Sequence, residues 1–243
     1  MNKIYIAMWS GPRNLSTALM RSFENRTDTT VIDEPFYAHF LKQTNLNHPG
    51  RDEIISTQDS NWKSIVKRIT GPIPQNKSIW YQKHMAQHNL EGCDINWIKN
   101  FHNCILIRDP KYVIPSYNKE HFLSDEKLLG YSQQLDLIQM LEDEEGVTPP
   151  IFDATDILKN PEQALKTICL FAGISFSDKM LKWPRGKRKS DGIWAKYWYG
   201  NVENSSGFKP FQKKNIIIDK ELIPLYDKCL EGYNSMYEKR INF

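Results

Sequence analysis

Short runs of apolar residues recur along the first two thirds of the chain, and they are rich in Ile, Val, Tyr or Phe. None is longer than seven residues, a length typical of a buried strand rather than a helix. Helical patterns separate the runs, and such alternation is typical of a parallel sheet that is covered on both faces. We therefore predict an α/β fold, a three-layer sandwich with a central parallel sheet of about five strands. The expected strands are residues 3–9, 29–33, 78–83, 103–108 and 150–154.

Apolar residues at helical spacing, together with capping residues, predict the helices between and after these strands. Ser124 is a suitable N-cap for a long helix through Leu141. Asn160 followed by Pro161 is a typical helix start, and Gly173 is a typical end. The expected helices cover residues 15–23, 62–69, 124–141, 161–172 and 223–237.

Residues 183–215 lack a clean period, so we expect an irregular lid within a single domain that spans residues 1–243. The segment begins with four basic residues and continues with four aromatic ones. These are Arg185, Lys187, Arg188 and Lys189, then Trp194, Tyr197, Trp198 and Tyr199.

Charge and composition narrow the classes of function. The net charge of +3 is a mild excess without a basic arm, so we expect no nucleic-acid partner. No run approaches the roughly 18 apolar residues of a membrane span, and residues 4–9 are too few for a signal peptide. The four cysteines have no metal-like spacing, which is typical of reduced core thiols. We expect a soluble, cytoplasmic protein without a metal site.

The stretch from Ser10 to Thr17 has the form of an anion-binding loop. A glycine-containing turn that leads from a parallel strand into a helix presents backbone N–H groups at the helix N-terminus. Arg13 adds a cation with a planar set of donors, and Ser16 and Thr17 add hydroxyl groups. The loop lacks the Gly-Lys-Ser/Thr ending of a nucleoside triphosphatase, so it suits a phosphate group held without a metal ion.

Three motifs together resemble the sulfotransferase superfamily over about residues 3–180. They are GPRNLSTALMR (11–21), CILIRDPKYVIPSY (104–117) and DATDILKNPEQALKTICLFAGI (153–174). The loop is similar to that of the arginine-containing branch, although Asn14-Leu15 stands where Ser-Gly or Gly-Thr is usual. The resemblance implies a P-loop-like fold and the sulfuryl donor 3′-phosphoadenosine 5′-phosphosulfate (PAPS).

The resemblance also implies which residues hold this donor. The loop residues Gly11, Pro12, Arg13, Asn14, Leu15, Ser16 and Thr17 would bind the 5′-phosphosulfate. Arg108 and Ser116 would bind the 3′-phosphate, and Arg188 and Lys189 lie roughly where the family has a basic lid over that phosphate.

Sulfuryl transfer needs a base for the acceptor's proton and cations for the charge on the transferring group. Glu34 ends the second expected strand, where parallel sheets place their ligands, and a glutamate at this place is the base in the similar branch. Lys83 ends the third strand and matches a lysine that contacts the transferring sulfate in the protein-tyrosine type. With Arg13, these residues form the expected catalytic set.

Several alternatives remain open for the base and for a metal site. Asp33 is the rival beside Glu34, and His84 and His39 are alternative bases. His84 and His88 have a possible metal spacing, but no third ligand is evident. Phe36, Tyr37, Phe40 and the cluster at 194–199 are candidates to line an acceptor pocket.

The predicted function is PAPS-dependent sulfuryl transfer to a hydroxyl group, with an amine as the second choice. The acceptor would be a small molecule, a carbohydrate or a lipid. Two other classes stay open: a kinase-like phosphotransferase, and a non-catalytic module that binds a nucleotide. The identity of the acceptor and the oligomeric state cannot be read from the sequence.

Overall fold

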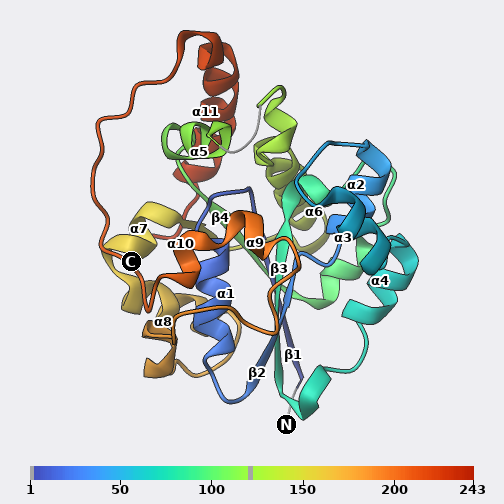
Figure 1. The fold of residues 1–243 in the computed structure, drawn as a ribbon. Coiled ribbons are helices and arrows are strands. Elements are labelled where there is room, and N and C mark those ends of the chain that lie inside the picture. The colour runs from blue at the N-terminus through green and yellow to red at the C-terminus, as the bar shows by residue number, and fades with distance from the viewer. Residues whose placement is uncertain (1–2, 120–122) are drawn as a thin grey trace.

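The computed structural model describes residues 3–119 and 123–243, and a five-stranded parallel sheet lies at its centre (Figure 1). The strand order is β2-β3-β1-β4-β5. All five expected strands are confirmed, with boundaries within two residues of the prediction. The strands are β1 (Ile4–Ser10), β2 (Thr29–Asp33), β3 (Ile79–Met85), β4 (His102–Ile107) and β5 (Ile151–Asp153).

Alternating side chains of the central strand β1 bury both faces of the sheet. Ile6 and Met8 pack in a core with α1 (Ser16–Glu24) and α8 (Pro161–Phe171). Ala7 and Trp9 pack in a second core against helices of the opposite layer. Figure 1 shows α1 and α8 on one side of the sheet and α4 and α6 on the other. The predicted three-layer α/β architecture is thus confirmed.

The other helices complete these two layers and a cap over one end of the sheet. They are α2 (Tyr37–Thr44), α3 (Arg51–Thr57), α4 (Trp62–Ile69), α5 (Pro110–Asn118), α6 (Tyr131–Glu145), α7 (Ala154–Lys159), α9 (Ala195–Trp198), α10 (Gly200–Glu203) and α11 (Ile223–Glu238). Single 3-10 turns occur at Pro74–Asn76, Ala86–His88, Asn96–Asn100, Glu126–Leu128, Asp178–Leu181 and Lys220–Leu222.

Two helix starts follow the sequence signals closely. The Asn160 side chain accepts a hydrogen bond from Gln163 N at the start of α8, and Gly173 follows the end of this helix with φ 64°. Helix α11 begins at Ile223 with Pro224 in its first turn, where no intrahelical donor is needed.

The long helix predicted from Ser124 is wrong in its first part. Residues Glu126–Leu128 form only a 3-10 turn, which Asp125 caps in place of Ser124. Gly130 then adopts φ 81°, and α6 begins at Tyr131. A left-handed residue cannot continue a right-handed helix, so the apolar pattern is shared by two elements.

The segment 183–215 is irregular, as expected, except for the short helices α9 and α10. An isolated antiparallel bridge joins Lys182 to Gly207. Figure 1 shows the chain then looping outward between α10 and α11.

The four cysteines are unpaired, and three of them are buried. Cys93 is half-exposed, so the expectation of a core thiol is wrong at that position. Burial raises the pKa of Cys104 to about 12, which keeps its thiol protonated.

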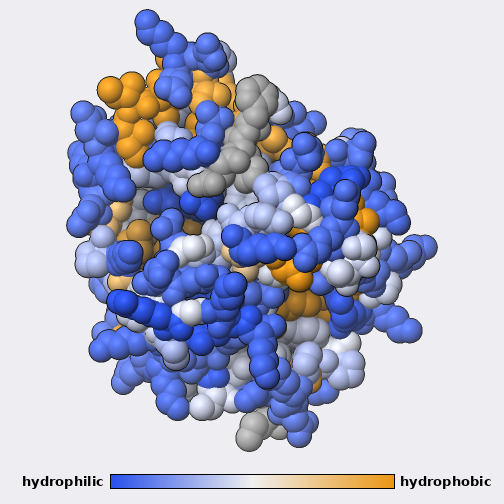
Figure 2. Space-filling view, in the orientation of Figure 1, coloured by the Kyte–Doolittle hydropathy of each residue, from blue (hydrophilic) through white to orange (hydrophobic). Residues whose placement is uncertain are grey.

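Hydrophilic residues cover most of the face in Figure 2, and hydrophobic ones gather over α11 and the segment before it. Within the described ranges, no helix has the length and apolar character needed to cross a membrane.

Candidate active site

A cleft of about 1080 Å³ lies at the carboxyl ends of the strands. Parallel α/β sheets place their ligands at this edge. The cleft is lined by nearly all the residues that the motifs single out: Pro12, Arg13, Asn14, Leu15, Ser16, Thr17, Glu34, Lys83, Arg108 and Ser116. Gly11 lies behind the lining, where it supports the loop.

Gly11 allows a close backbone approach beneath the anion-binding loop. A Cβ atom at this position would lie 2.1 Å from the Leu129 carbonyl oxygen, so no other residue fits without a shift of backbone. The loop thus packs directly on the chain that enters α6.

The loop itself holds strained backbone. Arg13 and Leu15 adopt φ values of 62° and 74°, a region that costs a non-glycine residue about 1–2 kcal/mol. Leu15 is one of the positions where glycine is usual in the similar family, and the chain keeps a glycine-like conformation without the glycine. Leu15 is the N-cap of α1 and its side chain makes no capping hydrogen bond, so the residue at this position does not compete with an anion for the first N–H groups of the helix.

The Arg13, Arg108 and Ser116 side chains converge from three segments. Arg13 Nε donates to Ser116 Oγ at 2.9 Å, and Arg108 Nη1 donates to the Arg13 carbonyl at 2.7 Å. Burial lowers the pKa of Arg108, and no carboxylate of the described residues is within ion-pair distance of it. Two neighbouring guanidinium groups beside a hydroxyl form a suitable site for a phosphate.

Lys83 lies buried between two carboxylates at the end of β2. Its Nζ is 2.9 Å from Asp33 Oδ1 and 2.5 Å from Glu34 Oε1. The Tyr199 hydroxyl is the third partner, at 2.8 Å. Burial works against the charge of Lys83, but the carboxylates of Asp33 and Glu34 raise its pKa well above the usual value.

Asp33 and Glu34 both contact the Lys83 ammonium group, but their other surroundings differ. Asp33 is fully engaged by Lys83, by the Tyr199 hydroxyl at 2.7 Å and by Gly192 N at 3.2 Å. Glu34 lines the cleft, with a backbone φ of 42°. Burial raises the pKa of Glu34 and the Asp33 charge adds to this, whereas Lys83 lowers it.

The two alternative histidine bases do not reach the cleft. His84 is buried on the other side of β3, where its ring stacks on Trp9 at 4.4 Å, and burial lowers its pKa to about 3. His39 binds the Ser60 carbonyl and lines a separate, shallow pocket. Neither histidine is therefore placed to take a proton from an acceptor bound in this cleft.

His88 lines the cleft, stacked on Tyr37 at 5.0 Å. Burial lowers its pKa well below the usual value, so its ring is neutral at pH 7. The part of the chain that the structure describes contains no cluster of three possible metal ligands.

Several cleft residues were missed or only partly found by sequence reasoning. His48 and Tyr117 line the cleft beside Tyr37. His48 lies outside the three motifs, and Tyr117 is the last residue of the second motif but was not singled out as a site residue. Tyr37, Trp198 and Tyr199 do line it, as the aromatic clusters suggested, whereas Phe36, Phe40 and Trp194 belong to the core.

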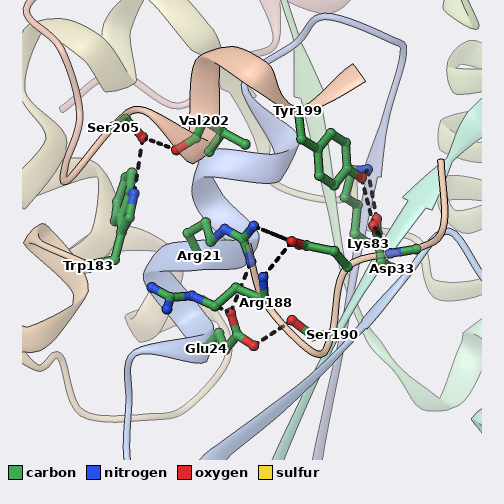
Figure 3. Close-up of polar contacts among 12 residues, drawn as sticks. Arg21, Glu24, Asp33, Lys83, Trp183, Arg188, Ser190, Tyr199, Val202 and Ser205 are labelled. Atoms are coloured by element: carbon green, nitrogen blue, oxygen red, sulfur yellow. Dashed lines mark hydrogen bonds and ion pairs between the residues drawn. The ribbon is translucent and has the colours of Figure 1, made fainter. Parts of the chain in front are cut away.

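The structure places the expected basic lid elsewhere. Arg188 lies along α1, where it contacts Glu24 at 3.6 Å (Figure 3). It also donates to the Pro184 carbonyl. The reason is the buried ion pair between Arg21 and Asp191, which ties this loop to α1. Neither Arg188 nor Lys189 lines the cleft.

The cations on this side of the cleft come from a later part of the same segment. Lys209 and Lys214 line it, next to Phe211. Basic residues are frequent throughout 183–215, so the sequence did not indicate which of them reach the site.

Residues 4–237 match the sulfotransferase domain family. The chain belongs to this family. The family and the fold support sulfuryl transfer in general for this sulfotransferase domain.

Two Arabidopsis thaliana proteins, branched-chain-amino-acid aminotransferase-like proteins 1 and 2, are 38% identical to the domain over 232 residues. The matched region is 94% of this chain but 41% and 40% of those two proteins. The chain therefore spans about two fifths of the length of the curated relatives that it matches.

Two solved sulfotransferase domains share the fold. One, from the Synechococcus PCC 7002 olefin synthase, has a TM-score of 0.51 at 16% identity and covers 93% of this chain and 94% of its own. The other, from the curacin biosynthetic pathway, has a TM-score of 0.50 at 14% identity, with 98% and 97% covered.

Replacing Gly11 by Ala tests the close approach beneath the loop. The added Cβ would force the Leu129 carbonyl away, so we expect the free energy of unfolding to fall by about 1–3 kcal/mol in urea titrations. Gly200→Ala is the matched control, because a Cβ there meets nothing within 4 Å. Equal stability of the two variants would contradict this account of the loop.

The burial of His84 predicts a pH dependence of stability. Its pKa is near 6.5 in the unfolded chain and about 3 in the folded protein, so below pH 6.5 protons bind only the unfolded chain. This residue should therefore lower the free energy of unfolding by about 2 kcal/mol between pH 7 and pH 5. His84→Phe should lose that part of the slope, whereas His102→Gln, at an exposed position, should keep it.

Proposed function

We propose that this protein transfers a sulfuryl group from PAPS to a hydroxyl group of an acceptor, with an amine as the second choice. The observation that carries the proposal is that the anion-binding loop, the Arg108–Ser116 site and the Glu34–Lys83 pair line one cleft. A donor with phosphate groups at two ends and a reacting sulfur near one of them would contact all three.

The charge balance of the cleft supports a polyanionic donor. The lining residues of the described chain include six cations and one carboxylate, Glu34. PAPS carries a phosphosulfate and a separate phosphate, so it would compensate this excess. The cations are Arg13, Lys83, Arg108, Lys119, Lys209 and Lys214.

Each end of the donor has its own set of partners in this proposal. The N–H groups at the start of α1 and the Arg13 side chain would hold the 5′-phosphosulfate. Arg108 and Ser116 would hold the 3′-phosphate. Lys209 and Lys214 take the role of the lid that the sequence assigned to Arg188 and Lys189.

The reaction needs one proton acceptor and one mobile cation at the sulfur. When bound, PAPS supplies the sulfuryl group. Glu34 takes the proton of the acceptor hydroxyl, and its raised pKa makes it a stronger base than an ordinary carboxylate. Lys83 and Arg13 stabilise the negative charge on the transferring group and on the departing phosphate.

The residues that line the cleft do not suit a kinase-like phosphotransferase. Such an enzyme would use a loop lysine and an acidic residue for Mg²⁺, but the loop has neither Gly-Lys-Ser nor Gly-Lys-Thr. Glu34 is the single carboxylate among the described lining residues, and it is paired with Lys83.

Replacing Arg108 by Ala tests the donor site without any acceptor. We expect wild-type protein to bind 3′-phosphoadenosine 5′-phosphate (PAP) more tightly than AMP or ATP-Mg in calorimetric titrations. The variant should bind PAP about 10- to 100-fold more weakly, the loss expected for a hydrogen bond to a charged group, and should bind AMP nearly unchanged.

Lys196→Ala is the control for a general loss of positive charge, because Lys196 pairs with Glu53 outside the cleft. It should bind PAP like the wild type. A wild-type preference for ATP-Mg over PAP would contradict the proposed donor.

Replacing Glu34 by Gln separates catalysis from binding. We expect turnover, followed as PAP released from PAPS with an acceptor panel, to fall by about 100-fold or more because the base is lost. The affinity for PAP should stay within about threefold.

The pH profile gives a second test of Glu34. Activity should rise with pH through the raised pKa of this group, so the acid limb should lie above the ordinary value of 4.5. Full activity of Glu34→Gln at all pH values, with a normal response to PAP, would favour a different base. PAP binding without any transfer by the wild type would favour the non-catalytic module.

A further inference from the structure

All three N–H donors of the Lys83 ammonium group are already occupied in this structure. Its partners are Asp33 Oδ1 at 2.9 Å, Glu34 Oε1 at 2.5 Å and the Tyr199 hydroxyl at 2.8 Å. A lysine ammonium has no further hydrogen to donate. Lys83 can therefore contact a transferring sulfuryl group only if it gives up one of these three partners.

The three partners differ in how firmly they are held. Asp33 also accepts from the Tyr199 hydroxyl at 2.7 Å and from Gly192 N at 3.2 Å. Tyr199 is buried, and its hydroxyl also accepts from Trp194 Nε1 at 3.3 Å. Figure 3 shows Tyr199 reaching down from the turn between α9 and α10 toward Lys83 and Asp33. Asp33 and Tyr199 thus form a closed set with Lys83 that does not depend on Glu34.

Of the two carboxylate partners, Glu34 is the one that lines the cleft. Its side chain is 11% exposed, against 1% for Asp33, and it stands on a strained backbone. Breaking the contact between Lys83 and Glu34 leaves both groups facing the cleft, where a ligand and an acceptor can meet them.

We propose that Tyr199, together with Asp33, is a positioning residue that anchors two N–H groups of Lys83 while the third exchanges between Glu34 and an oxygen of the transferring sulfuryl group. This inference rests on the proposed function. It assigns a role to a residue in the irregular segment, which none of the motifs covers.

The exchange of the Lys83 hydrogen bond from Glu34 to the sulfuryl oxygen would stabilise the charge on the sulfuryl group and at the same time strengthen Glu34 as a base. The groups that face Glu34 are Lys83, Asp33, Tyr199 and Tyr37. Of these only Lys83 is a cation, and its hydrogen bond to Glu34 is one cause that lowers the pKa of Glu34, so loss of this bond raises that pKa. Glu34 then becomes a stronger base when the sulfuryl group is in place.

The sulfuryl transfer needs only PAPS, the acceptor, Glu34 and Lys83. The acceptor oxygen forms a bond to sulfur, and its proton passes to Glu34. The bond between sulfur and the 5′-phosphate oxygen breaks, and its electron pair stays on that phosphate. Lys83 remains an ammonium group throughout and keeps its two contacts with Asp33 and Tyr199.

Tyr199→Phe removes the hydroxyl and keeps the ring, and Tyr197→Phe is the matched control. Tyr197 lies two residues away and is 40% exposed, outside the cleft. We expect Tyr199→Phe to lower kcat for PAPS turnover by about tenfold or more, with KM for PAPS and Kd for PAP within about threefold of wild type. Tyr197→Phe should match the wild type in all three.

Comparing kcat with the affinity for PAP shows whether the proposed function or only the role of Tyr199 is wrong. If the wild type does not bind PAP, the proposed function fails and this inference fails with it. If the wild type binds PAP and turns over PAPS, but Tyr199→Phe has the same kcat over the whole pH profile, only the positioning role is overturned. A loss of PAP affinity equal to the loss of kcat would also overturn it, because that indicates a structural role.

A measurement on the wild type covers the case in which Tyr199→Phe does not fold. We expect an NMR signal from a lysine ammonium group that exchanges slowly with water and is absent in Lys83→Met, since three buried hydrogen bonds protect it. PAPS should shift this signal, because one partner changes. Absence of a protected signal, or an unchanged signal with saturating PAPS, would overturn the inference.

Discussion

The site depends on the contacts of the buried Lys83 ammonium group with Asp33, Glu34 and Tyr199. A charge in this position needs close partners, and the chain supplies Asp33 at the end of β2, Glu34 directly after it and Tyr199 from the segment after residue 190. Removing Lys83 would leave two buried carboxylates without their cation, which is far more costly than losing a surface ion pair. The same contacts therefore close the irregular segment over the sheet and set the geometry of the cleft.

Backbone strain is concentrated around the same cleft. Six non-glycine residues of the described chain have positive φ, and three of them, Arg13, Leu15 and Glu34, line it. The other three are Asn45, Gln75 and Asn76, and asparagine tolerates this conformation well. Strain of this kind persists only where the surroundings hold it, here the Leu129 carbonyl beneath Gly11 and the Lys83 cluster beside Glu34. The loop and the expected base are thus held in place by packing rather than by their own conformational preferences.

Prediction from sequence succeeded where one local property decides the outcome. Short apolar runs gave all five strands, and the cap of α8 follows from Asn160 and its neighbours. The prediction of a helix from Ser124 failed because periodicity does not reveal that Gly130 is left-handed. His84 was a reasonable candidate base by residue type, but the period of two along β3 turns it into the core while Lys83 faces the cleft.

The sequence alone determined the parallel α/β fold, the family and the loop and strand-end residues that line the cleft, because each follows from a local pattern or a short motif. Tertiary structure alone decided which basic residues reach the cleft and that Tyr199 completes the Lys83 cluster. These outcomes depend on contacts such as that between Arg21 and Asp191, which are 170 residues apart. The composition of an irregular segment does not predict such long-range pairings, because the path of the segment depends on the residues against which it packs.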